Sequence, residues 1–450
     1  MKNYKIVFVG ASYLFCHRVF KDLVKIEELR NSTVVLFDIN PEPIKYISAV
    51  CKIMNEISGT NIKVEGTTDR KKALAGADYV MLCINVGGER ADMEAGKICR
   101  KYRISNTVGD TMGPSALVRS LRNIEALMVI VKDMEKLCPE AWLINFTNPM
   151  SQLTSVVQRY SKIKCVGLCH AIGGVEEMVC KIYGAEKKEI NVFAAGTNHF
   201  TWVKEIWVKG ENKTASWYGD FCKYITKPKA VKKKSKDWLE QERLHEKWDI
   251  TAKLFKWYGM MPVAGDNHIV EFFPHFLDPN SKNGNDFGLK KRDFNKAIKG
   301  KLNSKELLKK WISRVEDPWD MDKPSGEEAH NIMMSIIRNK GDINPAVNIL
   351  NNGSVSNLPD DYCLEIPAVF GQFGYKALSL GALSRPVAEV VGRMGAIHKL
   401  TADSAMTGDR KLAMQALMLD PLLKDFKNAE VLLEEMLTKQ KQYLPRFFKN

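Results

Sequence analysis

Three residues that can bind a metal ion follow two expected strands of a sheet. Cys169 and His170 come directly after the apolar segment 164–168, and His199 follows the apolar segment 192–195. A thiolate and an imidazole at adjacent strand ends can share a divalent ion and leave coordination positions open for substrate oxygens. A Cys-His pair by itself is more often part of a core, but His199 at the same edge favours a metal site.

Two aspartates stand in loops that contain glycine and proline. Asp110 lies in NTVGDTMGPSAL, just before a helical segment that carries Arg119 and Arg122. Asp266 lies in MPVAGDNHIVEFF, after another helical segment. Carboxylates in such loops can reach into a site and act as an acid or a base. Each aspartate, taken alone, could equally be a helix cap.

A nucleotide-binding turn is predicted after the first apolar strand. A strand, a tight glycine turn and a helix N-terminus form a cradle for pyrophosphate, and an acid after the second strand binds the ribose hydroxyls. Here Gly10 is followed by Ala11 and Ser12, where further glycines are usual. Asp38 closes VVLFDIN, and an acid there suits NAD and repels the 2′-phosphate of NADP. The alternative is that Asp38 only caps the turn after it.

Strands and helices alternate over the first 200 residues. Short apolar runs predict six strands, and amphipathic helices between them are typical of a parallel α/β sheet. The runs lie at 4–9, 34–37, 79–84, 141–144, 164–168 and 192–195. Polar residues follow every run, and they include Ser12, Asp38, Asn85, Asn148, Cys169 and His199. Since open parallel sheets bind ligands beyond the carboxyl ends of their strands, we expect one crevice there, with Asn85 among the cofactor contacts.

The pattern changes near residue 200. Helices are predicted at 248–258, 387–400, 409–419 and 429–437. We therefore expect an α/β protein with two domains. Residues 1–195 form a Rossmann-type NAD-binding domain, a parallel sheet with helices on both faces. Residues 196–450 form a mixed, largely helical domain that covers the crevice and serves substrate, metal and oligomerisation.

Composition indicates a globular enzyme and argues against two classes of partner. The chain has 450 residues, of which 45% are hydrophobic, and a net charge of +14. Its densest basic run, 227–236, has no aromatic residues for stacking on bases, so no nucleic-acid partner is expected. No apolar run approaches the roughly 20 residues of a membrane helix, and the N-terminus is typical of a strand and not of a signal peptide. We expect a cytoplasmic protein whose ten cysteines are reduced thiols.

Several of these motifs together resemble glycoside hydrolase family 4, whose members depend on NAD and a divalent metal. The segments that carry the resemblance span about residues 4 to 370. They are VVLFDIN, AGADYVMLCINVGGER, VGDTMGP, AWLINFTNPMSQLT, VGLCH, AAGTNHFTW and NNGSVSNLPDDYCLEIP. The VGDTMGP loop and GDNHIVEFFP are most similar to the α-galacturonidase-like members.

The resemblance implies roles for individual residues. Cys169 and His199 match the metal ligands, which usually bind Mn²⁺, and Asn148 matches a contact to a substrate hydroxyl. Arg90 ends the VGGER segment, which lines the sugar site. Asp266 matches the residue that removes the C2 proton.

The resemblance also bears on the substrate. His170 directly after the metal cysteine is similar to the branch that cleaves non-phosphorylated α-glycosides. With the galacturonidase-like loops, it implies an anionic hexopyranoside such as a uronide or a sulfonated sugar. Ala171 departs from the pattern, because those members carry an acid there.

The mechanism that the resemblance implies begins with oxidation of the sugar. NAD⁺ takes a hydride from C3, the metal polarises the new ketone, and Asp266 removes the C2 proton. The aglycone then leaves C1, with Asp110 or His170 as its proton donor. Water adds at C1 and the hydride returns, so NAD is not consumed.

Other functions remain open from the sequence. An NAD-dependent dehydrogenase of a sugar or a 2-hydroxy acid is the main alternative, and it would release NADH. A regulatory NAD-binding protein is favoured only by the glycine-poor turn, and a nucleic-acid binder only by the charge. The expected partners are a small glycoside and further copies of the chain, in a homodimer or homotetramer, with no membrane.

Overall fold

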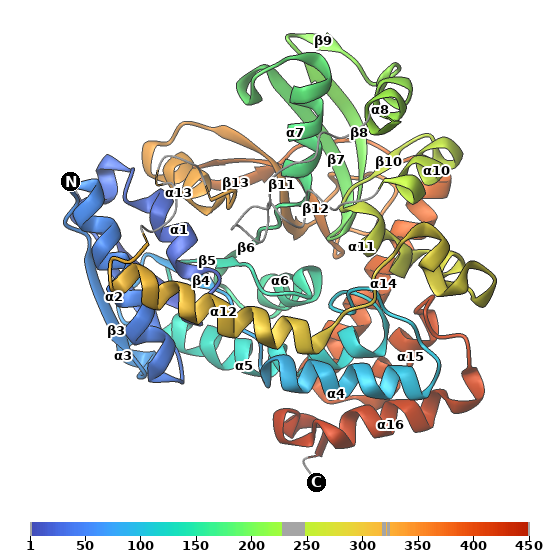
Figure 1. Ribbon diagram of the computed structural model, residues 1–450, viewed down its shortest axis with the longest axis horizontal. Coiled ribbons are helices and arrows are strands. Elements are labelled where there is room, and N and C mark those ends of the chain that lie inside the picture. The colour runs from blue at the N-terminus through green and yellow to red at the C-terminus, as the bar shows by residue number, and fades with distance from the viewer. Residues whose placement is uncertain (1, 227–247, 317–320, 322–324, 449–450) are drawn as a thin grey trace.

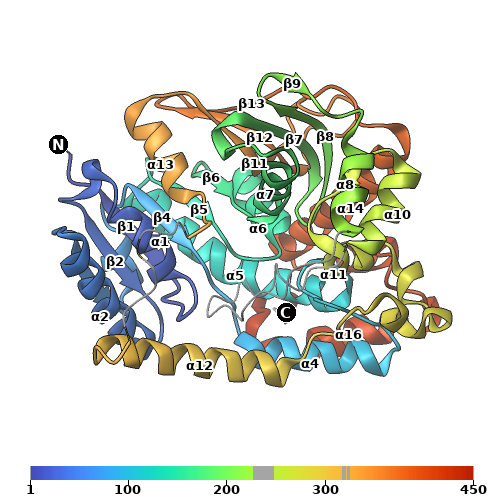
Figure 2. The same ribbon diagram turned by 45° about the horizontal axis from the view of Figure 1, so that its top comes forward.

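A single mixed sheet runs through the whole molecule (Figures 1 and 2). The computed structural model describes residues 2–226, 248–316, 321 and 325–448. The basic run 227–236 therefore lies outside the described residues. The sheet has the strand order β10-β8-β7-β12-β11-β6-β5-β4-β1-β2-β3, with β9 beside β8 and β13 beside β12.

The N-terminal half of the sheet is parallel, as predicted. Its six strands are β3 (Lys63–Thr67), β2 (Thr33–Phe37), β1 (Lys5–Val9), β4 (Tyr79–Leu82), β5 (Trp142–Asn145) and β6 (Lys164–Gly167). The helices between and after them are α1 (Cys16–Leu23), α2 (Pro41–Ser58), α3 (Arg70–Leu74), α4 (Gly88–Lys101), α5 (Gly113–Leu137), α6 (Met150–Tyr160) and α7 (Ala171–Tyr183). The near-continuous apolar runs of β1, β2, β4 and β5 are buried, which fits a parallel sheet covered by helices. The Rossmann-type α/β class is confirmed.

The C-terminal half of the sheet is antiparallel. It consists of β7 (Ile190–Thr197), β8 (Phe200–Val208), β9 (Glu211–Asn212), β10 (Met261–Pro262), β11 (Asp342–Leu350), β12 (Cys363–Gly371) and β13 (Gly374–Ala377). The expectation that 192–195 continues the parallel sheet is wrong. Strands β11 and β12 lie between β6 and β7, and the pairs β6–β11, β11–β12 and β12–β7 are all antiparallel, so β7 runs opposite to β6. The predicted boundary after residue 195 falls inside β7.

One row of residues across the sheet nevertheless brings the expected ligands together. Gly167 of β6 pairs with Asn348 of β11, which pairs with Glu365 of β12, which pairs with Gly196 of β7. Cys169 follows Gly167 by two residues, and His199 follows Gly196 by three. The two therefore meet through this cross-strand row and not through parallel strand ends.

Helices of the C-terminal half surround the sheet. They are α8 (Trp217–Thr226), α10 (Asp249–Tyr258), α11 (Gly265–Phe272), α12 (Phe294–Ile312), α13 (Ala329–Arg338), α14 (Arg385–Thr407), α15 (Arg410–Leu419) and α16 (Ala429–Lys439). Four of them, α10, α14, α15 and α16, confirm the predicted helices, and most of their ends lie within a few residues of the predicted ends. Helix α12 lies alongside α2 and α4, and α14 packs on α5 and α6, so the two halves of the chain are interleaved (Figures 1 and 2).

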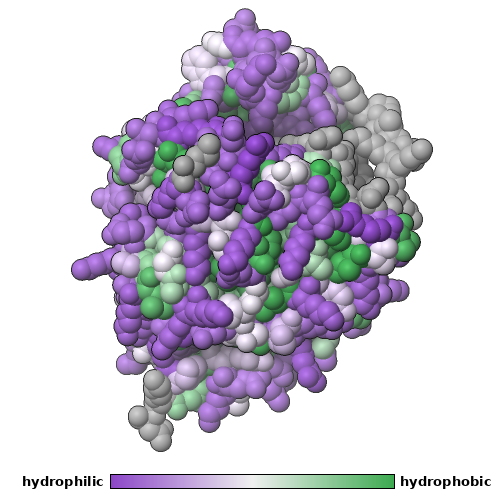
Figure 3. Space-filling view, turned by 90° about the vertical axis from the view of Figure 1, so that its left-hand side faces the viewer, coloured by the Kyte–Doolittle hydropathy of each residue, from purple (hydrophilic) through white to green (hydrophobic). Residues whose placement is uncertain are grey.

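The surface and the cysteines agree with a globular chain. On the face seen from the left of Figure 1, hydrophobic residues form scattered areas among hydrophilic ones (Figure 3). All ten cysteines are free thiols, as predicted. In the part of the chain that the structure describes, no helix combines the length and the apolar character needed to span a bilayer.

Candidate active site

The turn between β7 and β8 places His199 at the centre of the site. Asn198 and His199 connect the paired residues Thr197 and Phe200, and His199 has a left-handed backbone conformation with φ of 61°. The ring is buried, and its Nδ1 lies 2.8 Å from the Thr111 hydroxyl. Burial, with the neighbouring charge of His268, lowers the pKa of His199 to about 3. The imidazole is therefore neutral, which is the form that binds metals.

His199 forms a candidate metal centre with Asp110 and His268. One ligand atom from each of the three residues lies within 4.8 Å of the others. Nδ1 of His199 is 4.0 Å from Oδ1 of Asp110, and the two imidazole rings have centroids 4.2 Å apart. Two imidazoles and a carboxylate suit a first-row divalent ion such as Mn²⁺.

Helix α11 holds this cluster through its own acidic residues. Asp266 is 1% exposed, and its carboxylate accepts hydrogen bonds from the first turn of α10. Oδ2 accepts from the backbone N–H of Ile250 at 2.9 Å, and Oδ1 accepts from the backbone N–H and the hydroxyl of Thr251 at 2.8 Å each. Burial raises the pKa of Asp266 to about 6. The Asp266 carboxylate thus faces the N-terminus of α10, whereas His268, two residues later in the chain, lies beside His199.

The other end of α11 fixes the loop that carries Asp110. Oε1 of the buried Glu271 accepts hydrogen bonds from the backbone N–H groups of Thr107, Val108 and Gly109 at 2.8, 2.8 and 2.9 Å. Three such bonds to one carboxylate define the path of the loop. Helix α11 therefore couples α10, His268 and Asp110 in one unit.

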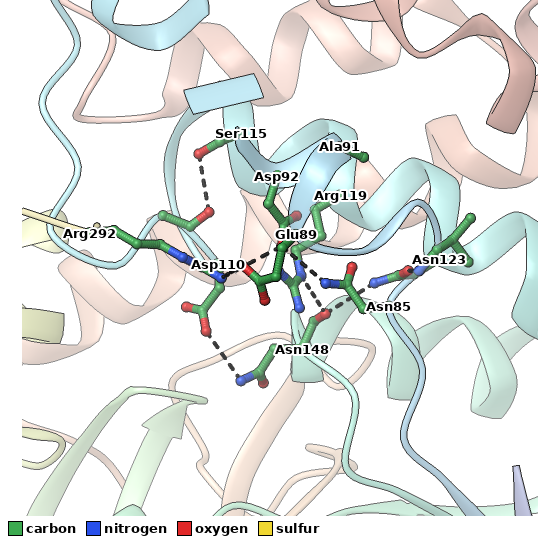
Figure 4. Close-up of polar contacts among 12 residues, drawn as sticks. Asn85, Glu89, Ala91, Asp92, Asp110, Ser115, Arg119, Asn123, Asn148 and Arg292 are labelled. Carbon is green, nitrogen blue, oxygen red and sulfur yellow. Dashed lines mark hydrogen bonds and ion pairs between the residues drawn. The ribbon is translucent and has the colours of Figure 1, made fainter. Parts of the chain in front are cut away.

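Asp110 is an ionised acid at the heart of the site. Its Oδ1 lies 2.9 Å from the hydroxyl of Thr111, and its Oδ2 accepts a hydrogen bond of 3.4 Å from the side-chain amide of Asn148 (Figure 4). Burial acts to raise the pKa of Asp110, but its interactions with the imidazoles of His199 and His268 and with the guanidinium groups of Arg119 and Arg292 outweigh burial and lower it. Asp110 is thus available as a metal ligand.

A buried charge network lies beside Asp110 (Figure 4). Asp92 of α4 pairs with Arg119 at 2.6 Å and with Arg122, and Arg292 lies 3.6 Å away. Arg292 also pairs with Glu89 at 3.1 Å. Three guanidinium groups thus face two carboxylates, and the charges of Arg119 and Arg292 help to lower the pKa of Asp110.

Three predicted contacts lie around this network. Asn85, expected at the cofactor, donates its side-chain amide to Asp92 at 3.0 Å. The backbone carbonyl of Asn148 accepts from Arg119 at 3.2 Å, which fixes the residue, while its buried side-chain oxygen has no hydrogen-bond partner among the described residues. That oxygen can accept a hydroxyl from a sugar. Arg90 is exposed on α4.

Cys169 and His170 lie next to the His199 turn but outside the three-residue cluster. Burial, together with the charge of Glu365, raises the pKa of the Cys169 thiol, while the side-chain amide of Asn198 acts to lower it. A metal would have to displace the thiol proton to bind there. His170 precedes the first residue of α7, and its charge contributes to the low pKa of His199.

The turn after β1 has the features of a dinucleotide cradle. Gly10 has φ of 95°, and a Cβ there would lie 2.1 Å from the carbonyl oxygen of Cys83. Only glycine fits this close approach. Helix α1 follows with no side-chain cap at Phe15, so its first backbone N–H groups can bind a pyrophosphate.

The second half of this cradle is the end of β2. Asp38 accepts the backbone N–H of Ala11 at 3.0 Å and that of Asn40 at 2.9 Å, which ties the two loops together. The Ser12 hydroxyl accepts the N–H of Leu14 at 3.2 Å, within the turn. Ile39, next to Asp38, is 88% exposed and offers an apolar surface for a flat base. The residues present fit a dinucleotide.

Comparison with known proteins identifies the family. The model of the family 4 glycosyl hydrolases matches residues 5–185, and the model of their C-terminal domain matches residues 194–423. The chain belongs to family 4 of the glycosyl hydrolases. The Asp110–His199–His268 cluster, the charge network beside it and the turn after β1 are thus parts of a glycosidase.

Relatives within family 4 have different named activities. A "Probable 6-phospho-beta-glucosidase" of Bacillus subtilis (strain 168) is 30% identical and covers 99% of this chain and 98% of its own. An alpha-galacturonidase of the same organism is also 30% identical, over 96% of each chain. The overall similarity therefore shows the family and does not single out a substrate.

Solved structures agree with this assignment. The crystal structure of the Bacillus subtilis protein lplD, described as a glucosidase, superposes with a TM-score of 0.85 at 27% identity, over 97% of this chain and 100% of that one. A 6-phospho-alpha-glucosidase from gut microorganisms, solved in complex with NAD and Mn²⁺, has a TM-score of 0.82 at 19% identity, over 99% of each chain. The second comparison shows that the fold is shared.

Residues of this family 4 site that the sequence did not reveal are His268 and the arginine network. His268 stands in the same GDNH segment as Asp266, so a search for every imidazole near the predicted site could have found it. Arg292 comes from a part of the chain with no motif, and only the fold brings it to Asp92.

Proposed function

We propose that this family 4 enzyme hydrolyses glycosides of an anionic, non-phosphorylated hexopyranose, such as a galacturonide, another uronide or a sulfonated sugar. The observation that carries the proposal is the position of the Asp110–His199–His268 cluster beside the unpartnered oxygen of Asn148. A sugar hydroxyl donated to that oxygen would lie next to the metal donors. His170 and the galacturonidase-like loops support the non-phosphorylated branch.

The arginine network supports an anionic substrate. Arg119 and Arg292 lie near Asp110, and the three guanidinium groups of the network share the carboxylates of Glu89, Asp92 and Asp110. A carboxylate or sulfonate on the sugar would accept stronger hydrogen bonds from guanidinium groups than a neutral hydroxyl would.

We propose NAD and Mn²⁺ as the cofactors of this chain. NAD would bind at Gly10, Ala11, Ser12 and Asp38, with Asn85 at the edge of its site. His199 would be a metal ligand, with Cys169 as the family resemblance implies, and Asp110 and His268 would supply further donors. When bound, the pair supplies reversible hydride acceptance at C3 and Lewis acidity at the sugar oxygens.

The side chains of the site divide the remaining work. Asp266 is the proposed base for the C2 proton, and a pKa of about 6 suits a base that works near neutral pH. Its three hydrogen bonds from the first turn of α10 hold the carboxylate in one orientation. Because its lowered pKa leaves Asp110 without a proton near neutral pH, His170 would protonate the departing oxygen, and Asn148 and Arg90 would contact the sugar.

A substrate panel tests this proposal. Nitrophenyl glycosides of neutral, 6-phosphorylated, uronic and sulfonated sugars would be assayed with and without NAD⁺ and Mn²⁺. We expect nitrophenol release to be fastest for a uronide or sulfonated sugar and to require both additions. Faster cleavage of a neutral or 6-phospho glycoside would contradict the substrate class. NADH accumulation without nitrophenol would instead indicate a dehydrogenase.

We also infer a cytoplasmic enzyme that works as a homodimer or homotetramer on a small glycoside. These statements rest on the sequence and on its resemblance to the family. Light scattering of the purified chain measures the mass in solution, and a monomer would contradict the inferred assembly.

A further inference from the structure

A buried carboxylate lies directly behind the metal-binding turn. Glu365 of β12 is fully buried. Its Oε2 accepts hydrogen bonds from the side-chain amides of Asn198 at 2.8 Å and Asn348 at 3.0 Å. Its Oε1 accepts one from the hydroxyl of Thr201 at 2.9 Å. Two of the three donors, Asn198 and Thr201, flank His199 in the sequence.

These bonds hold a turn that is strained at His199. A non-glycine residue at φ of 61° is in an unfavourable conformation that persists only where its surroundings fix it. The backbone N–H of Asn198 donates to Ser151 at 3.2 Å, so Asn198 is held through both backbone and side chain. Glu365 and Ser151 are therefore the groups that fix the start of the turn.

The same contacts reach the second proposed ligand. The Asn198 side-chain amide, which donates to Glu365, also lies near enough to the Cys169 thiol to act on its pKa. Glu365 thus orients one residue that lies beside Cys169 and precedes His199. The row Gly167–Asn348–Glu365–Gly196 across the sheet places Glu365 between the strands that carry the two ligands.

The groups around Glu365 account for an acid at this position. All three side chains that face Glu365 donate hydrogen bonds, so a carboxylate, whose two oxygens both accept, satisfies them. An amide would not, because its NH₂ group cannot accept. No Lys, Arg or His within the described ranges forms an ion pair with Glu365. An uncompensated buried carboxylate is costly, and a divalent ion at the neighbouring turn is a charge that would offset it.

We propose that Glu365 is a positioning residue for the metal of this enzyme. It holds the Asn198–His199 turn in place through its hydrogen bonds from Asn198 and Thr201. The proposal rests on the proposed metal site at His199 and Cys169. Residues that orient metal ligands in this way typically change metal affinity by about 10–100-fold when they are mutated.

Binding of Mn²⁺ to the metal-free full-length chain tests the role without an activity assay. Free Mn²⁺ is measured by electron paramagnetic resonance, and the spectrum of the bound ion is recorded. Glu365→Gln should bind about 10–100-fold more weakly, with an altered spectrum of the bound ion. Glu125→Gln is the matched control, because that buried carboxylate pairs with Arg446 away from the turn. It should bind like the wild type.

Two further results decide the proposal. Wild-type affinity and an unchanged spectrum for a folded Glu365→Gln would overturn it. If that variant does not fold, Thr201→Val decides, because it keeps the charge and removes one hydrogen bond; weaker binding supports the role and wild-type affinity overturns it. Absence of Mn²⁺ binding by the wild type would instead overturn the proposed metal site itself.

Discussion

Replacement of Asp266 separates a structural role from a chemical one. Asp266→Ala leaves the backbone N–H groups of Ile250 and Thr251 without their acceptor in a buried place. At about 1–3 kcal/mol for each group, the free energy of unfolding should fall by roughly 2–6 kcal/mol. Asp266→Asn keeps one side-chain oxygen that can accept from Thr251, so only the backbone N–H of Ile250 loses its acceptor. The free energy of unfolding of this variant should therefore fall by about 1–3 kcal/mol.

Thermal unfolding followed by circular dichroism measures this series. The unfolding entropy of about 2.1 cal/mol/K per residue gives about 0.9 kcal/mol/K for 450 residues. Tm should therefore fall by roughly 2–6 °C for the alanine variant and about 1–3 °C for the asparagine variant. Asp249→Asn, an exposed acid on the same helix turn, is the control and should change little.

The activities of the Asp266 variants should follow a different order from their stabilities. A base cannot be replaced by an amide, so the asparagine variant should have no turnover although it keeps much of the wild-type stability. Equal Tm values for the wild type and Asp266→Ala would refute the structural reasoning. Turnover by Asp266→Asn near the wild-type rate would refute the assignment of the base.

Three shorter predictions follow from the same contacts. Chelation with EDTA or His199→Ala should abolish turnover, and Mn²⁺ should restore only the chelated wild type; full activity in EDTA would refute the metal site. Asp38→Ala should weaken NAD⁺ binding in calorimetry without loss of fold, and tighter binding of NADP⁺ than NAD⁺ by the wild type would contradict its ribose contact. With Asp266 as a base of pKa about 6, kcat/KM should fall as the pH drops below 6, because the carboxylate becomes protonated; a flat profile between pH 5 and 7 would contradict that role.

Local patterns in the sequence predicted much of the fold. The buried runs of β1, β2, β4 and β5 and the helical periodicity of α14, α15 and α16 depend on neighbours in the chain. Cys169, His199 and Asn148 follow predicted strands, where polar residues mark a crevice, and Asp110 lies in a loop with glycine and proline before a helix. The structure places these residues in one region, around the Asn198–His199 turn and the loop of Asp110.

Long-range contacts account for what the sequence could not predict. The direction of β7 depends on β12, which lies some 170 residues further along the chain. The orientation of Asp266 depends on α10, and nothing in MPVAGDNHIVEFF predicts that the first turn of this helix faces the carboxylate. Glu365 gave no signal, since a single acid in an apolar strand acquires its meaning only from the donors that surround it.

If this enzyme breaks the glycosidic bond through an oxidised sugar, as proposed, the C2 proton of the sugar must exchange with solvent during turnover. If Asp266 removes the C2 proton, that proton exchanges with solvent before the hydride returns. Turnover in D₂O should then place deuterium at C2 of the released sugar, which NMR detects. A pair of carboxylates acting as acid and nucleophile would leave the C2–H bond untouched. Product with only hydrogen at C2 would contradict the account.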